Sequence, residues 1–151
     1  IQLRQKQKVK RMYGLLEKQF RKYFETATRE RGNTGAALIT LLERRLDNVL
    51  YRLQLAPTRT AARQYVTHGH VVVDGKKVSI PSYLVKAGAV ITMKTKFLET
   101  PLIKKLVEEK NVQVPCWLIR KGPVGKVERI PQRSDVIEDI DEQLIIEFYS
   151  R

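Results

Sequence analysis

The sequence predicts an α+β fold, in which a helical amino-terminal part precedes a mixed part with about four or five short strands. Apolar residues recur at helical spacing through the first third of the chain. Short valine-rich runs follow, and the turn-forming pair Asp74-Gly75 separates two of them. A run of helices followed by a run of strands is typical of an α+β fold.

The first third of the chain predicts three helices. Residues 2–13 have helical spacing and end at Gly14, which favours a break. Residues 15–30 predict a second helix, with Leu16 and several aromatic residues on its apolar face. Residues 36–53 carry one continuous stripe of leucine and valine, so we expect a single third helix there.

A short helix and a hairpin follow. Thr58 is a good N-cap for a helix over residues 59–68, and Gly69 stands where a C-cap glycine belongs. Residues 71–78 have the alternation and turn chemistry of a β-hairpin. We expect further strands over residues 82–93.

The last third predicts one more helix and a second hairpin. Thr100 followed by proline opens a helix that runs to about Lys110. Residues 114–119 and 126–130 flank a glycine- and proline-containing turn, and the apolar setting of Cys116 in the first of these runs predicts a core position. Residues 144–149 are a short apolar helix or strand.

Charge is unevenly distributed along a chain whose formal net charge is +13. Residues 1–31 carry +7, residues 32–93 carry +5 and residues 94–133 carry +6, whereas residues 134–151 carry −5. A strongly basic surface binds polyanions through phosphate contacts and counterion release. We expect the acidic carboxyl end to pack on the basic body or to meet a second protein.

The sequence contains no signal of catalysis or membrane insertion. No phosphate-binding glycine loop, zinc-protease motif or nucleophile elbow occurs, and no apolar run approaches the roughly 18 residues of a membrane span. His68 and His70 lack partner ligands nearby, so we interpret one as packed and one as lying at a binding rim. Asp47 stands among arginines and predicts an ion pair. We therefore predict no enzyme, no cofactor and no metal.

Nucleic-acid binding is the sharper hypothesis. Arg59 and Arg63 are four residues apart on the predicted helix, so their guanidinium groups project from one face and can grip successive phosphates. Arg52 and the hairpin lysines extend this surface, and Tyr83 could stack on an unpaired base.

The run RLDNVLYRLQLAPTRTAARQYVTHGHVVVDGKKV, residues 45–78, resembles the α-L RNA-binding motif. The resemblance extends beyond that motif to the S-four family of small-subunit ribosomal proteins, through KQKVKRMYG at 6–14, EKQFRKYF at 17–24 and DEQLIIEFYSR at 141–151. Residues 94–127 match this family least. The family's further amino-terminal extension, sometimes with zinc-binding cysteines, is missing here, so the resemblance assigns no zinc site.

The resemblance implies two domains: a discontinuous helical domain of residues 1–46 with 134–151, and an inserted α-L domain of residues 47–133. The inserted domain is expected to have a small, mostly antiparallel sheet packed on helices. It implies a structural protein that binds the 5′ domain of 16S-type ribosomal RNA at a multi-helix junction and nucleates assembly. It further implies a role in decoding accuracy, contact with messenger RNA where it enters the subunit, contact with neighbouring ribosomal proteins, and autorepression of translation in some relatives. The expected location is the small ribosomal subunit, in the cytoplasm or in an organelle. No membrane partner is expected, and the protein is expected to be a monomer when it is free of the ribosome.

The resemblance also implies site residues. The residues expected to contact RNA are Lys6, Lys8, Lys10, Arg11, Arg21, Lys22, Arg45, Arg52, Arg59, Arg63, His68, Lys76, Lys77 and Tyr83. The residues expected at a protein interface are Asp135, Glu138, Asp139, Asp141, Glu142 and Glu147.

Other functions remain open at this point. The α-L motif also occurs beside the catalytic domains of RNA-modifying enzymes and tRNA synthetases, and in non-ribosomal RNA-binding proteins. An enzyme would need a catalytic domain, for which residues 94–151 are too few. A surface for acidic proteins leaves the motif unexplained, and DNA binding is a weaker alternative.

Overall fold

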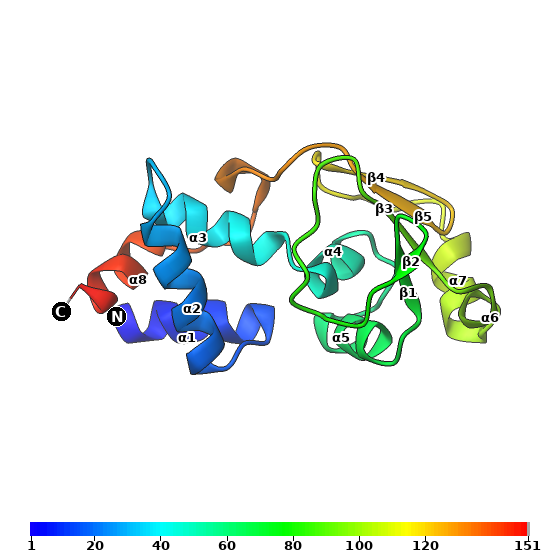
Figure 1. The fold of residues 1–151 in the computed structure, drawn as a ribbon, viewed down its shortest axis with the longest axis horizontal. Helices are drawn as coiled ribbons and strands as arrows, with labels where there is room; N and C mark the ends of the chain where they lie inside the picture. The colour runs from blue at the N-terminus through cyan, green and yellow to red at the C-terminus, as the bar shows by residue number, and fades with distance from the viewer. Residues whose placement is uncertain (151) are drawn as a thin grey trace. The chain divides into compact units, whose positions relative to one another are not determined.

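The computed structural model describes residues 1–150, and the chain divides into two compact units (Figure 1). The first unit comprises Ile1–Glu43 and the chain from Gln132 onward, and the second comprises Arg44–Pro131. Arg44 belongs to the second unit because its backbone oxygen accepts from Val85 N at 2.9 Å and its Nε donates to Val85 O at 3.0 Å.

The first unit is helical, and both ends of the chain contribute to it. Its elements are α1 (Gln2–Tyr13), α2 (Glu17–Thr28), α3 (Thr34–Glu43), the 3₁₀ turn η1 (Arg133–Asp135) and α8 (Glu142–Tyr149). Helix α8 packs against α1 and α3, and α2 packs against α3. Val9, Phe20, Leu38 and Ile145 are fully buried among them. The carboxyl-terminal helix therefore completes the core of the amino-terminal helices.

Two predictions for this unit have different outcomes. Gly14 does end α1, with a left-handed φ of 70° that glycine adopts without strain, so that prediction is confirmed. Leu16 was expected on the apolar face of the second helix, but it is 70% exposed. That prediction is wrong because α2 begins only at Glu17 and Leu16 is its extended N-cap residue.

The predicted third helix, residues 36–53, is interrupted. Its sequence forms α3 and then α4 (Leu46–Arg52), with Arg45 extended between them at φ −61° and ψ 139°. Arg45 forms a β-bridge with Leu84, and Leu46 N donates to Tyr83 O at 2.8 Å. Pairing with a segment almost forty residues away in sequence therefore replaces the local helical hydrogen bonds, although the apolar stripe continues through the break.

The second unit packs helices against a five-stranded sheet of order β2-β1-β3-β5-β4, in which every neighbouring pair is antiparallel. The helices are α4, α5 (Arg59–Thr67), α6 (Thr95–Leu98) and α7 (Pro101–Glu108). The strands are β1 (Val71–Val73), β2 (Lys76–Lys77), β3 (Val90–Met93), β4 (Leu118–Lys121) and β5 (Val124–Val127). Leu50, Val66, Ile91 and Trp117 are fully buried in its core. The α+β prediction is confirmed.

Local predictions in this unit were partly correct. The first hairpin turns at Asp74 and Gly75, whose φ values of 51° and 83° are both left-handed, as a type I′ turn requires. Strands were expected over residues 82–93, but only β3 forms there. Cys116 was expected in the core, but it is exposed because it precedes β4 while Trp117 fills the core position.

Candidate nucleic-acid interface

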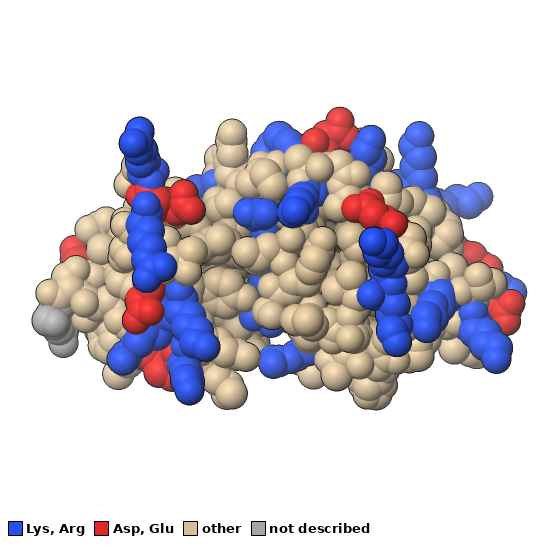
Figure 2. Space-filling view, in the orientation of Figure 1, with Lys and Arg blue, Asp and Glu red and all other residues tan. Residues whose placement is uncertain are grey.

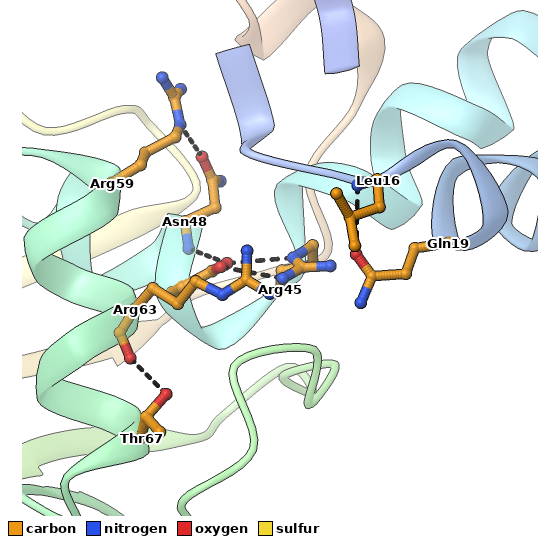
Figure 3. Close-up of polar contacts among 8 residues, drawn as sticks. Leu16, Gln19, Arg45, Asn48, Arg59, Arg63 and Thr67 are labelled. Carbon is orange, nitrogen blue, oxygen red and sulfur yellow. Dashed lines mark hydrogen bonds and ion pairs between the residues drawn. The ribbon is translucent and has the colours of Figure 1, made fainter. Parts of the chain in front are cut away.

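Helices α4 and α5 fix the position of Arg59, an arginine of the predicted surface. Thr58 Oγ1 accepts from Ala61 N at 3.0 Å, so the predicted cap fixes the start of α5. Arg59 then donates from Nε to Asn48 Oδ1 at 2.9 Å, as Figure 3 shows. Its guanidinium lies 4.5 Å from the centre of the Tyr51 ring. These two contacts restrict the rotamers of Arg59, which lowers the entropy lost when it binds a phosphate.

Arg45 has a different role from the one predicted. It is only 1% exposed, and its Nε and Nη2 bind Asp47 Oδ1 and Oδ2 at 3.1 and 2.9 Å. Asp47 Oδ1 also accepts from Asn48 N at 2.7 Å (Figure 3). The predicted ion pair of Asp47 is thus present. Because the fork of Arg45 is buried and bonded within the fold, we leave this arginine out of the binding surface.

The other arginines of α4 and α5 are half-exposed. Arg52 ends α4, and Arg63 stands one turn after Arg59 on α5, where Arg63 O accepts from Thr67 Oγ1 at 2.8 Å (Figure 3). We call the set Arg52, Arg59 and Arg63 the α5 surface.

The hairpin and the end of α5 carry the remaining predicted residues of this unit. Lys76 and Lys77 are exposed on β2, and His68 is exposed as the C-cap residue of α5. Tyr83 is half-buried and packs against the hydrophobic core. Only part of the Tyr83 side chain is therefore open to RNA.

Two lysines of the first unit are used inside the fold. Lys6 is 5% exposed, and the Nζ atoms of Lys6 and Lys10 lie 2.9 and 2.8 Å from Glu17 Oε2. Lys6 Nζ also lies 4.4 Å from the centre of the Phe148 ring, and Tyr149 Oη donates to Glu17 Oε1 at 3.1 Å. We leave both lysines out of the binding surface.

The electrostatics of Glu17 support this structural role. Burial alone would raise the pKa of its carboxyl group, but hydrogen bonds from Lys10, Lys6 and Tyr149 outweigh burial and lower the pKa to about 2. The same site raises the pKa of Tyr149, first through burial and then through the Glu17 charge. The carboxylate thus stays ionised at neutral pH and binds both ammonium groups.

Exposed cations remain on α1 and α2. Arg11, Arg21 and Lys22 are exposed, and Lys8 is exposed while its Nζ donates to the backbone oxygen of Asp139. We call Arg11, Arg21 and Lys22 the amino-terminal basic surface. Figure 2 shows Lys and Arg side chains on both units, with Asp and Glu side chains beside them at several places.

Of the six carboxylates near the carboxyl end, some bind other groups of the protein and others are open to solvent. Asp135 Oδ2 accepts from Gln132 N at 2.7 Å, and Glu142 Oε1 lies 3.1 Å from Arg133 Nε. The other four carboxylates are half-exposed or exposed, and Glu147 Oε2 also accepts from Gln2 Nε2 at 3.2 Å. The exposed or half-exposed members that could meet a partner are Glu138, Asp139, Asp141 and Glu147.

Sequence reasoning missed the residues that orient the arginines. Asn48 and Tyr51 position Arg59, and their spacing of three residues on α4 was the available signal.

Within the described residues, no group of three or more His, Cys, Asp or Glu side chains could hold a metal ion. The described helices also include none that is long and apolar enough to cross a membrane.

Comparisons with known proteins agree along the whole chain. One family model, described as the ribosomal protein S4/S9 N-terminal domain, matches residues 1–43, and another, the S4 domain, matches residues 44–91. Small ribosomal subunit protein uS4A of Alkaliphilus metalliredigens is 51% identical over 153 residues, and uS4 of Polaromonas naphthalenivorans is 52% identical over 155 residues. Small ribosomal subunit protein uS4A of Clostridium botulinum is 53% identical over 153 residues. Each match covers 100% of this chain and 74% of the relative.

Proposed function

Because this chain belongs to the uS4 family of small ribosomal subunit proteins, we propose that it is a structural constituent of that subunit and binds its ribosomal RNA. The observation that carries the proposal is the match over the full chain, which includes both units rather than the S4 domain alone. The relatives are ribosomal structural proteins and not enzymes, so the alternative of an RNA-modifying enzyme is set aside.

The mechanism is passive and electrostatic. The α5 surface presents guanidinium forks on a helix whose start is fixed by the Thr58 cap, and such forks match phosphate oxygens in pairs. Each phosphate that is neutralised releases condensed counterions, and this release supplies most of the affinity. Recognition of RNA shape through phosphates and sugars, rather than base reading, then sets the specificity.

We assign both units to the same RNA. The amino-terminal basic surface adds cations on α1 and α2, and the hairpin lysines add two more on β2. A multi-helix junction requires its helices to approach one another against phosphate repulsion, and two separate basic surfaces lower that repulsion on more than one helix. The presence of basic surfaces on both units supports binding to a junction in the 5′ domain and an early role in assembly.

We propose three further roles because the chain belongs to this family. They are contact with messenger RNA where it enters the subunit, an influence on decoding accuracy, and autorepression of translation. The exposed carboxylates Glu138, Asp139, Asp141 and Glu147 are suited to a neighbouring ribosomal protein with a basic surface. In the absence of RNA, we propose that the protein is a monomer.

Affinity for RNA over a salt series tests the central proposal. The chain is titrated with a small-subunit 5′-domain RNA and with an unrelated duplex of equal length. We expect tighter binding to the 5′-domain RNA at every salt concentration, with affinity falling as salt rises in both cases. Equal affinity for the two RNAs would show that only nonspecific charge attraction is present and would refute the assignment.

A further inference from the structure

Positive charge gathers at the carboxyl end of α5, on residues beyond the α5 surface. His68 is the exposed C-cap residue of the helix, and His70 is half-exposed immediately before β1. Their ring centres lie 6.2 Å apart. Lys77, on β2, lies beside Gly69, and Lys94, which follows β3, lies close enough to His70 to act on its charge. We call these four residues the histidine cluster.

The fold holds the ring of His70 in one orientation. It stacks on Phe97 of α6 with the ring centres 3.9 Å apart and 6° between the planes. Phe97 in turn meets the edge of Tyr65 of α5, with ring centres 4.8 Å apart. One face of the imidazole is therefore covered by an aromatic ring, while its residue stays half-exposed. A ring held in this way can present its nitrogens to a ligand with little further loss of entropy.

The fold places Lys77 and Lys94 near the two histidines. Lys94 follows the Val71–Met93 pair of the sheet, and its backbone nitrogen donates to His70 O at 2.9 Å. Gly69 has a φ of 78°, and a Cβ placed there would lie 3.4 Å from Lys77 Cδ and 3.8 Å from Lys77 Nζ. The ammonium of Lys77 thus lies beside the turn that joins the two histidines.

The surroundings of His70 disfavour a positive charge on its ring. Burial is the largest influence that lowers the pKa of His70, followed by the positive charges of His68 and Lys94. The charges that act on His70 are thus cationic. The negative end of the α5 dipole attracts cations, but its effect is limited to the last turn. Further protonation of the cluster is therefore opposed unless a negative ligand enters.

We propose that the histidine cluster is a second phosphate-binding site for the ribosomal RNA, and that His70 takes up a proton when the phosphate binds. The proposal rests on the RNA-binding function above and adds His70 and Lys94 to the surface expected from the sequence. A phosphate near the His70 ring would attract the protonated imidazole, and the half-buried position of His70 would strengthen that attraction.

Proton uptake gives the site a defined pH dependence. In the free protein the pKa of His70 lies below its ordinary value, and a bound phosphate raises it. RNA affinity therefore increases as pH falls below the pKa of the bound state and becomes constant below the pKa of the free state. A rise of about one pKa unit on binding corresponds to an affinity gain of about tenfold across this range.

An NMR titration tests the proposal without changing the protein. The ring Cε1–H signals of His68 and His70 are followed against pH in the full chain, free and bound to the 5′-domain RNA. The expected result is a higher pKa of His70 in the complex. If binding leaves the pKa of His70 unchanged or lowers it, the proposal is wrong, although the RNA-binding function can still stand. Failure of the chain to bind this RNA at all would instead refute the proposed function.

Variants assign the pH dependence to individual rings. In His70→Asn the affinity gain between about pH 8 and about pH 5.5 should fall from about tenfold to less than about threefold. His68→Gln is the matched control for the second imidazole and should retain the gain attributed to His70. Far-ultraviolet spectra of both variants are compared with that of the wild type to verify that each variant folds. An undiminished pH dependence in His70→Asn would overturn the proposal, as would its complete loss in His68→Gln.

Discussion

The contact of Glu17 with Lys6 and Lys10 predicts how the first unit responds to acid. The carboxyl pKa of about 2, compared with 4.5 for a free side chain, corresponds to at most about 3.4 kcal/mol of stability. The Glu17 side chain is 40% exposed, so solvent screening reduces this figure to about 1–2 kcal/mol. Because the pKa is lowered by folding, this stability is complete above about pH 4.5 and is lost as pH falls toward about 2.

Replacing Glu17 by Gln removes that contribution. At neutral pH we expect the free energy of unfolding to fall by about 2–3 kcal/mol, since the buried ammonium of Lys6 also loses its partner. As pH falls toward about 3, the wild-type protein should lose stability that the variant has already lost, so the difference between them should shrink by about 1 kcal/mol or more.

Urea unfolding at several pH values measures this difference. Far-ultraviolet circular dichroism follows the helices, and fluorescence of Trp117, which is buried in the second unit, follows that unit separately. Glu25→Gln is the matched control, because Glu25 is exposed on the same helix, and it should change stability by less than about 0.5 kcal/mol. A difference between Glu17→Gln and wild type that stays constant from neutral to acid pH would refute the reasoning.

The remaining predictions concern RNA affinity. Changing Arg59 and Arg63 together to Ala should weaken binding by about tenfold or more with an unchanged far-ultraviolet spectrum, and lost helicity would instead show that the pair is structural. Asn48→Ala should weaken binding by about threefold to tenfold without changing the salt dependence, as measured by filter binding, because it releases the Arg59 side chain and leaves its charge in place. Changing Arg21 and Lys22 together to Gln should lower the slope of log affinity against log salt by about 1–2, and an unchanged slope would remove α2 from the interface.

The sequence predicted the elements whose signals are local. Gly14 and the Asp74-Gly75 turn adopt left-handed backbones that few other residues tolerate, and Thr58 caps α5 with its own side chain. The interruption of the helix at Arg45 could not be predicted in the same way. Its cause is the pairing of Arg45 with Leu84, and the apolar spacing of the sequence is the same with or without that pairing.

The exposure of the expected binding residues was harder to predict than the fold. A lysine or arginine in a basic motif has the same appearance in sequence whether it faces solvent or an internal carboxylate. Lys6 and Arg45 were expected to contact RNA, but both are buried beside acids. The acids that bind them, Glu17 and Asp47, were visible in the sequence, but their cation partners are fixed by tertiary packing and not by spacing alone.

The positions of these acids explain how a chain of net charge +13 folds before it binds RNA. Self-repulsion destabilises a compact state of high charge. Here Glu17 binds two lysines, Asp47 binds both nitrogens of one arginine fork, and Glu142 binds Arg133. Each acid thus compensates a cation that is buried or half-buried, where an unpaired charge costs most. For the cations on the outer faces, RNA phosphates can supply further compensation on binding. The same acidic residues therefore stabilise the free protein and leave its outward charge available for RNA.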